Sequence, residues 1–140
     1  MLPGISDSAF LIRRAGFEAP DTSGCRSHYQ TLDLSRIDIS WAGRLGEGNP
    51  SLKAIEALRV GDAVRLTREG GRWFLTDGAG VAVARLAKSW SPPPDVTFRS
   101  GRVMAITVRR REDGEAAYDH LIRRDIWEIV MPELVFEAGG

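Results

Sequence analysis

Short alternating segments separated by turn residues are the feature that most constrains how this 140-residue chain can fold. Apolar and polar residues alternate over residues 63–68, 73–76, 81–86 and 102–110, and a denser apolar run follows at 126–136. Glycine- or proline-containing turns separate these segments at intervals of roughly 8–12 residues, which is typical of small antiparallel sheets. We therefore predict a mainly β fold, a small antiparallel barrel or sandwich.

One short helix is expected at residues 50–58. Asn49 suits the position that caps a helix, and Pro50 suits the first helical position, where no backbone N–H is needed. Apolar residues then recur at every third position and form one stripe along the helix: Leu52, Ile55 and Leu58.

The length predicts a single domain over residues 1–140. We expect an irregular N-terminal part, residues 1–50, with short strands packed on it, and a helix plus a β-barrel core at residues 51–137. The alternation in residues 31–41 changes parity near residue 35, which predicts a bulged or bent strand pair. Pro132 is expected to break the last strand, because proline cannot donate a ladder hydrogen bond.

Several classes of protein are excluded by residue types. No apolar run approaches the roughly 20 residues of a membrane span, and residues 1–10 lack the order of a secretion signal, so we expect no membrane partner and a cytoplasmic location. One cysteine, Cys25, and two histidines cannot form a disulfide framework or a self-contained Cys/His zinc site. No Gly-Lys-Thr phosphate loop and no set of nucleophile, base and oxyanion donors occurs. We expect a non-enzymatic chain with no catalytic residue, metal or cofactor.

The charge is balanced overall but unevenly distributed. Of the 19 basic residues, 17 are arginines, whose planar donor fork suits phosphate and carboxylate. Residues 59–124 carry a net charge of +5, whereas residues 125–140 carry −4. The middle of the chain is therefore a basic segment followed by an acidic tail.

Basic and aromatic residues occur together at the predicted strand ends. Cations that follow a phosphate backbone, beside rings on which bases stack, are what single-stranded nucleic acid requires. We expect such a face to bind single-stranded or forked DNA, with these candidate residues: Arg72, Trp73, Arg85, Lys88, Trp90, Arg109, Arg110, Arg111, Arg123 and Arg124. The structural alternative is that the tryptophans belong to the core and the arginines are simply solvated.

Two longer segments, residues 58–90 and 102–137, resemble the C-terminal accessory region of bacterial RecQ-family DNA helicases. The resemblance covers about the last 80 residues and rests on Gly-Asp-x-x-x-Leu at 61–66, Trp-x-Leu-x-Asp at 73–77, Gly-x-x-Val-x-Arg-Leu-Ala at 80–87 and Trp-Glu-x-Val-x-Pro-Glu-Leu-Val-Phe at 127–136. It implies a non-catalytic DNA-binding module of DNA repair whose partner is a helicase motor, in cis or in trans.

The first half of the chain is also similar to the HIRAN module, a small β-barrel attached to DNA helicases and remodellers that binds DNA ends. HIRAN modules carry a loop rich in Asn and Asp where this chain has Gly70-Gly71-Arg72. The resemblance supports the expected barrel and the expected DNA partner, but this loop departs from the pattern.

A protein-docking module without DNA contact is the alternative function. In that case the apolar C-terminal strand and the acidic tail, residues 125–137, would meet a partner protein. Trp127 is expected in the core, because it lies in the densest apolar run. Glu128 and Glu133 lie in the same run, where an unpaired buried carboxylate is strongly disfavoured, so we predict that Glu128 pairs with an arginine of the basic strands.

Overall fold

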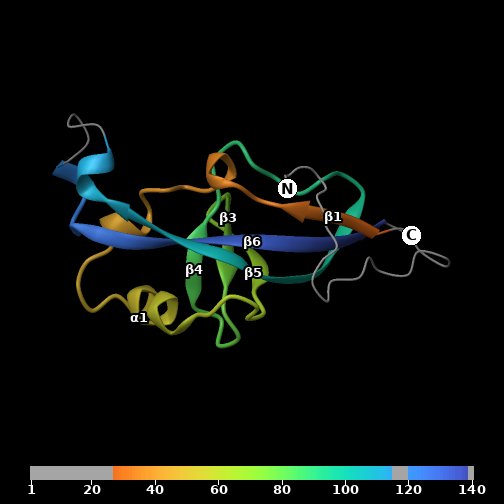
Figure 1. The fold of residues 1–140 in the computed structure, drawn as a ribbon. Coiled ribbons are helices and arrows are strands. Elements are labelled where there is room, and N and C mark those ends of the chain that lie inside the picture. Colours follow the sequence, from red (N-terminus) through yellow and green to blue (C-terminus); the bar gives the residue numbers. More distant parts are fainter. Residues whose placement is uncertain (1–26, 115–119, 139–140) are drawn as a thin grey trace, which may run out of the picture.

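The computed structural model describes residues 27–114 and 120–138. These residues form two three-stranded antiparallel sheets, one α-helix and several short 3-10 helices (Figure 1). The mainly β fold with one helix is confirmed, and the arrangement is that of a small sandwich. The predicted N-terminal part is described only from residue 27 onward, so Cys25 lies outside the described residues.

The larger sheet is built around the last strand of the chain. Strand β6 (Ile126–Ala138) lies between β1 (Ser27–Thr31) and β5 (Val96–Arg110), and it is antiparallel to both. Strands β5 and β6 form a long hairpin across the molecule, and η3 (Arg111–Asp113) follows β5 at its tip (Figure 1). Strand β5 begins at Val96, earlier than the alternation from residue 102 predicts.

The smaller sheet is a meander of β2 (Arg65–Glu69), β3 (Arg72–Thr76) and β4 (Ala82–Arg85). Gly70 and Gly71 join the first two strands with φ angles of 58° and 79°. A two-residue hairpin with a type I′ turn requires positive φ at both central positions, which glycine adopts without strain. The predicted hairpin is therefore confirmed.

The predicted helix is also confirmed, as α1 (Pro50–Ala57). The Asn49 side chain accepts a hydrogen bond from the Ser51 backbone N–H at 2.9 Å, so it caps the helix as expected. Ile55 and Leu58 are buried in the core. No helix in the described part of the chain has the length and apolar character needed to cross a bilayer.

Trp127 is a core residue, as predicted, with 5% of its surface exposed. Its indole Nε1–H donates to the Ile39 carbonyl oxygen at 2.8 Å, and its ring lies against Gly43. The side chain is therefore fixed by packing on one face and by a hydrogen bond at its edge.

The expected strand pair at residues 31–41 is wrong. After β1 the chain forms η1 (Leu34–Arg36) and η2 (Ala42–Arg44), and only Ile37 makes a β-bridge, with Leu86. The Asp33 carboxylate accepts hydrogen bonds from the Ser35 backbone N–H and hydroxyl. Such local side-chain bonds compete with strand pairing and favour a turn.

The expected break at Pro132 is also wrong, because β6 continues through this residue. Pro132 lies opposite Val103, and the pairing shifts between Val103 and Ala105, so Met104 is an extra residue on β5. This bulge lies where the missing N–H of proline would otherwise leave the ladder incomplete. The Pro132 carbonyl accepts a hydrogen bond from the Leu32 N–H at 3.1 Å, which continues the sheet toward β1.

The predicted pairing of Glu128 is wrong, and Glu133 takes the expected role. Glu128 is exposed, and no cation of the described residues lies within 4 Å of it. Glu133 is 9% exposed, and it accepts hydrogen bonds from the Arg102 guanidinium and from the Tyr29 hydroxyl. The register explains the difference, because Arg102 lies opposite Glu133 whereas Val108 lies opposite Glu128.

Candidate nucleic-acid interface

The two faces of the smaller sheet differ: the inner face packs against the hydrophobic core, and the outer face presents arginine side chains. In this register Phe74 lies opposite both Thr67 and Arg85, so these three side chains share one face with Arg72. The alternate residues, among them Leu75 and Ala84, are buried on the other face. The alternation of β3 therefore projects one arginine and one aromatic ring away from the core.

A segment from the first part of the chain extends this face at the edge of β4. The Asp38 N–H donates to the Arg85 carbonyl at 2.9 Å, and the Ala87 N–H donates to the Arg36 carbonyl at 2.8 Å. Together with the isolated bridge between Ile37 and Leu86, these bonds hold residues 36–38 along the edge of β4. The Asp38 side chain is thereby placed beside Arg85.

Three guanidinium groups converge on the carboxylate of Asp38. Arg85 donates to its Oδ2 from Nε at 2.9 Å and from Nη2 at 2.5 Å, and Arg44 Nη2 lies 3.0 Å from the same oxygen. Arg72 Nη2 is 3.6 Å away and also donates to the Leu86 carbonyl at 3.0 Å. One carboxylate against three guanidinium groups leaves this cluster with a net charge of +2, and on the same side of the sheet the charges of Arg65 and Glu69 offset each other.

The donors of this cluster are not all used. The arginine side chains are 24–34% exposed, so they are held in place but still reach solvent. Arg72 Nε is buried without a hydrogen-bond partner in the described part of the structure. Guanidinium groups that are held in place and still reach solvent form a preorganised site for an anion, because phosphate and carboxylate match the donor fork.

Two aromatic rings lie beside the arginines. Trp41 and Phe74 are half-buried and meet edge to face, with ring centroids 6.1 Å apart. We call the whole surface the arginine face and define it by these residues: Asp38, Trp41, Arg44, Arg72, Phe74 and Arg85. Rings next to guanidinium groups are the combination that bases and phosphates require.

Sequence reasoning found Arg72 and Arg85 but missed the other members of the arginine face. The alternation of side chains along β3 could have predicted that Phe74 lies beside Arg72, because residues two apart in a strand share a face. Nothing local could have placed Asp38, Trp41 and Arg44 there, since a non-local bridge brings their segment to β4.

The sequence predicts that Trp73 and Trp90 stack on bases, but the aromatic residues of the arginine face are Trp41 and Phe74. Trp90 is 5% exposed, its ring meets Trp73 edge to face, and its Nε1–H donates to Gln30 at 3.4 Å. The prediction is therefore wrong for Trp90, which belongs to the core. Trp73 is half-buried on the inner side of β3, and the Arg68 guanidinium lies 5.6 Å from its ring centroid. Lys88 is exposed in the turn after β4.

The hairpin arginines do not share the arginine face. Arg109 and Arg110 are neighbours on β5 and so point to opposite sides of the sheet. Arg109 donates to the Asp113 carbonyl at 3.1 Å, and Arg111 pairs with Asp125 at 3.4 Å, at the tip that extends beyond the smaller sheet in Figure 1. The candidate residues Arg109, Arg110 and Arg111 therefore do not lie on one face with Arg85.

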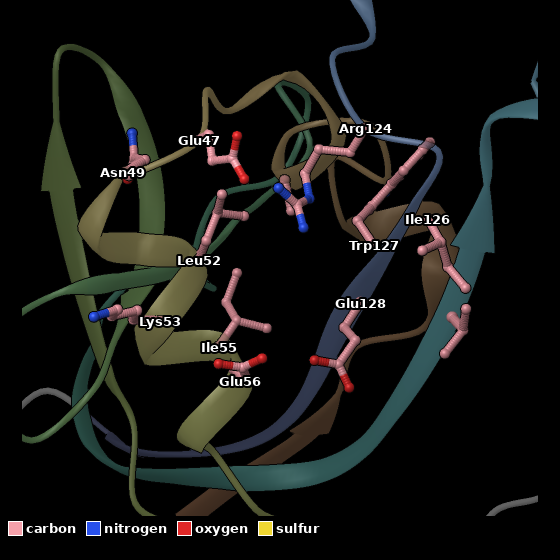
Figure 2. A pocket seen from close by; sticks show the side chains of 13 residues that line it. Glu47, Asn49, Leu52, Lys53, Ile55, Glu56, Arg124, Ile126, Trp127 and Glu128 are labelled. Atoms are coloured by element: carbon pink, nitrogen blue, oxygen red, sulfur yellow. The ribbon is translucent and has the colours of Figure 1, made fainter.

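The two remaining predicted arginines lie where the chain enters β6. The Arg123 N–H donates to the Gly43 carbonyl at 2.7 Å, and the Arg123 side chain is exposed. Arg124 lines a groove of about 500 Å³ between α1 and the β5–β6 hairpin (Figure 2). We call it the α1 groove. Its walls include Leu52 and Ile55 from the helix and Ile126 and Trp127 from the strand.

The described residues contain no group of three or more His, Cys, Asp or Glu side chains that could hold a metal ion.

Comparisons with protein-family models, with curated proteins and with solved structures found no match to this chain. The resemblances to the RecQ accessory region and to HIRAN modules stay predictions from the sequence.

Proposed function

We propose that this protein binds single-stranded DNA through the arginine face, as a non-catalytic module that works beside a helicase motor. The observation that carries the proposal is the convergence of three guanidinium groups on the single carboxylate of Asp38, next to two aromatic rings. The helicase partner rests on the sequence resemblance alone.

The chemistry of the arginine face suits a phosphate backbone. Asp38 holds Arg44, Arg72 and Arg85 in fixed positions, which reduces the entropy lost when a phosphate binds. The surplus positive charge attracts a polyanion, and binding then releases counterions, so affinity falls with salt. Trp41 and Phe74 offer ring surface for bases that a single strand exposes and a duplex buries.

The alternative function, docking of a partner protein on the apolar C-terminal strand and the acidic tail, needs side chains that are mostly buried or already paired. The apolar side chains of β6 are mainly core, including Val130, Leu134 and Phe136. Three of the four tail carboxylates pair with β5 or tip arginines: Asp125 with Arg111, Glu133 with Arg102 and Glu137 with Arg99. These observations favour DNA binding over docking through the tail.

The test is fluorescence anisotropy with labelled oligothymidine, a fork and a blunt duplex at about 50 and about 200 mM salt. The variant Arg44→Ser/Arg72→Ser should bind the single strand at least tenfold more weakly, about 1.4 kcal/mol, with a flatter salt slope. The matched control is Arg99→Ser/Arg110→Ser, which removes the same charge from β5 positions outside the arginine face. Wild-type protein without salt-dependent binding would overturn the proposal, and so would equal losses in the two double variants.

A second variant tests Asp38 in the opposite direction. Asp38→Asn keeps the shape of the side chain and removes the one negative charge of the arginine face. Provided that its melting curve remains cooperative, it should bind single-stranded DNA more tightly than wild type and with a steeper salt slope. Weaker binding by a folded Asp38→Asn variant would contradict the assigned role of the cluster.

A further inference from the structure

The α1 groove has apolar walls that the fold itself leaves uncovered. Val108 and Ile126 on the hairpin are 51% and 46% exposed, although the next residue along β6, Trp127, is buried. Both side chains line the α1 groove together with Leu52 and Ile55 of α1. Two exposed β-branched side chains beside a helix form an apolar surface of the kind that binds another protein segment.

The rim of the α1 groove is acidic. Glu47, Glu56 and Glu128 line it together with Lys53 and Arg124, so three carboxylates against two cations leave one net negative charge. None of the three carboxylates has an ion pair with another described residue, in contrast to Asp38 and Glu133. Figure 2 shows Glu56 on α1 and Glu128 on β6 on opposite sides of the groove, where both can meet one cation.

Arg124 adds a donor inside the α1 groove. Its Nε is buried and has no hydrogen-bond acceptor among the described residues, and its side chain points into the groove (Figure 2). The Arg124 side chain lines the groove and its guanidinium is a hydrogen-bond donor, so an occupant that brings an oxygen is favoured over a purely hydrocarbon one. A peptide carbonyl supplies such an oxygen without adding negative charge to an acidic rim.

We propose that the α1 groove docks a short basic amphipathic segment of a partner protein. Its apolar side chains would fill the space between α1 and the hairpin, its Lys or Arg side chains would meet Glu56 and Glu128, and a backbone carbonyl would accept from Arg124. The volume of about 500 Å³ suits a few side chains rather than a whole domain surface. The site uses other residues than the arginine face, and the inference stands without DNA binding.

The test uses two dye-labelled peptides with blocked ends: Lys-Leu-Leu-Lys-Leu-Leu-Lys and its counterpart with Glu in place of Lys. Anisotropy titration of the intact protein should show the basic peptide binding at least tenfold more tightly than the acidic one. The variant Glu56→Gln/Glu128→Gln should weaken the basic peptide at least fivefold. Ile126→Ser, which changes an exposed side chain, should do the same.

The matched control is Glu69→Gln/Asp95→Asn, which removes two exposed carboxylates away from the α1 groove and should leave the affinity unchanged. Thermal melting of each variant checks that the fold is kept. Similar affinities for the two peptides, no binding of either, or an equal loss in the control variant would each overturn the proposal. A loss with Glu56→Gln/Glu128→Gln but not with Ile126→Ser would also overturn it, because binding would then be electrostatic without docking in the groove.

Discussion

Gly43 is the position where a single added methyl group tests the packing most sharply. A Cβ built on Gly43 would lie 2.8 Å from Cδ2 and Cε2 of Trp127 and 2.9 Å from Cε3. Carbon atoms pack at about 3.5–4.0 Å, so the added methyl would overlap three atoms of the ring at once. Trp127 has no room to retreat, because it is buried and its Nε1–H is bonded to the Ile39 carbonyl.

The expected magnitude follows from two opposing effects. Overpacking a core costs about 1–3 kcal/mol. Replacing glycine by alanine stabilises a protein by about 0.4–1 kcal/mol where the backbone permits it, because the unfolded chain loses freedom. Gly43 is not among the glycines with positive φ, so the backbone permits alanine here. The two effects together give a net loss of about 0–2.6 kcal/mol, and overlap with three buried ring atoms excludes the low end, so we expect Gly43→Ala to lower the free energy of unfolding by about 1–2 kcal/mol.

Urea denaturation followed by tryptophan fluorescence measures this loss, with Gly46→Ala as the matched control. The nearest atom to a Cβ at Gly46 is Arg123 Nη1 at 3.8 Å, an ordinary contact, so that variant should stay within about 0.5 kcal/mol of wild type. In a Trp127→Phe background the smaller ring should relieve the overlap and reduce the loss from Gly43→Ala. A Gly43→Ala protein as stable as wild type would refute the packing described for Trp127.

Two further predictions concern stability. Trp127→Ala removes a buried indole ring and its hydrogen bond to Ile39, and it should lower the free energy of unfolding by about 3–5 kcal/mol, measured by urea denaturation; a variant that unfolds like wild type would contradict the core assignment. The hydrogen bond from the Ser35 hydroxyl lowers the pKa of the Asp33 carboxyl, so its stabilising effect is present at neutral pH and is lost as pH falls through that lowered pKa. The stability difference between wild type and Asp33→Asn should therefore shrink in acid, and a difference that grows at low pH would show the opposite sign.

Features that depend on neighbouring residues were predictable from the sequence. The cap of α1 by Asn49 and the hairpin at Gly70 and Gly71 each rest on backbone preferences within a few residues. The alternation of β2, β3 and β5 predicted strands because one face of each sheet packs on the core. The mainly β fold follows from these local signals together.

Features that depend on register were not predictable. The ion pair of Glu133 with Arg102 depends on the bulge at Met104, and a shift of one residue would turn every side chain of the strand to the other face. Trp90 is buried because Trp73 and Gln30 approach it from other parts of the chain, although its sequence neighbours Lys88 and Ser89 are exposed. The arginine face likewise depends on how residues 36–38 pair with the end of β4.

The central place of β6 has a consequence for how the chain assembles during translation. Tyr29 on β1 meets Glu133 on β6 across 104 positions of sequence, and β6 leaves the ribosome after every other described strand. Until then β1 and β5 lack their common neighbour, whereas the meander of β2, β3 and β4 already holds all its strands. The nascent chain therefore exposes the unpaired edge of β5, a strand of 15 residues, which is a stage prone to aggregation.

The same order of synthesis separates the two surfaces in time. Every member of the arginine face precedes residue 86, so that surface can assemble before the larger sheet closes. The α1 groove takes one wall from residues 124–128 and is complete only when the last strand has entered the sheet. A partner that binds in the α1 groove would consequently recognise only chains whose translation has passed β6.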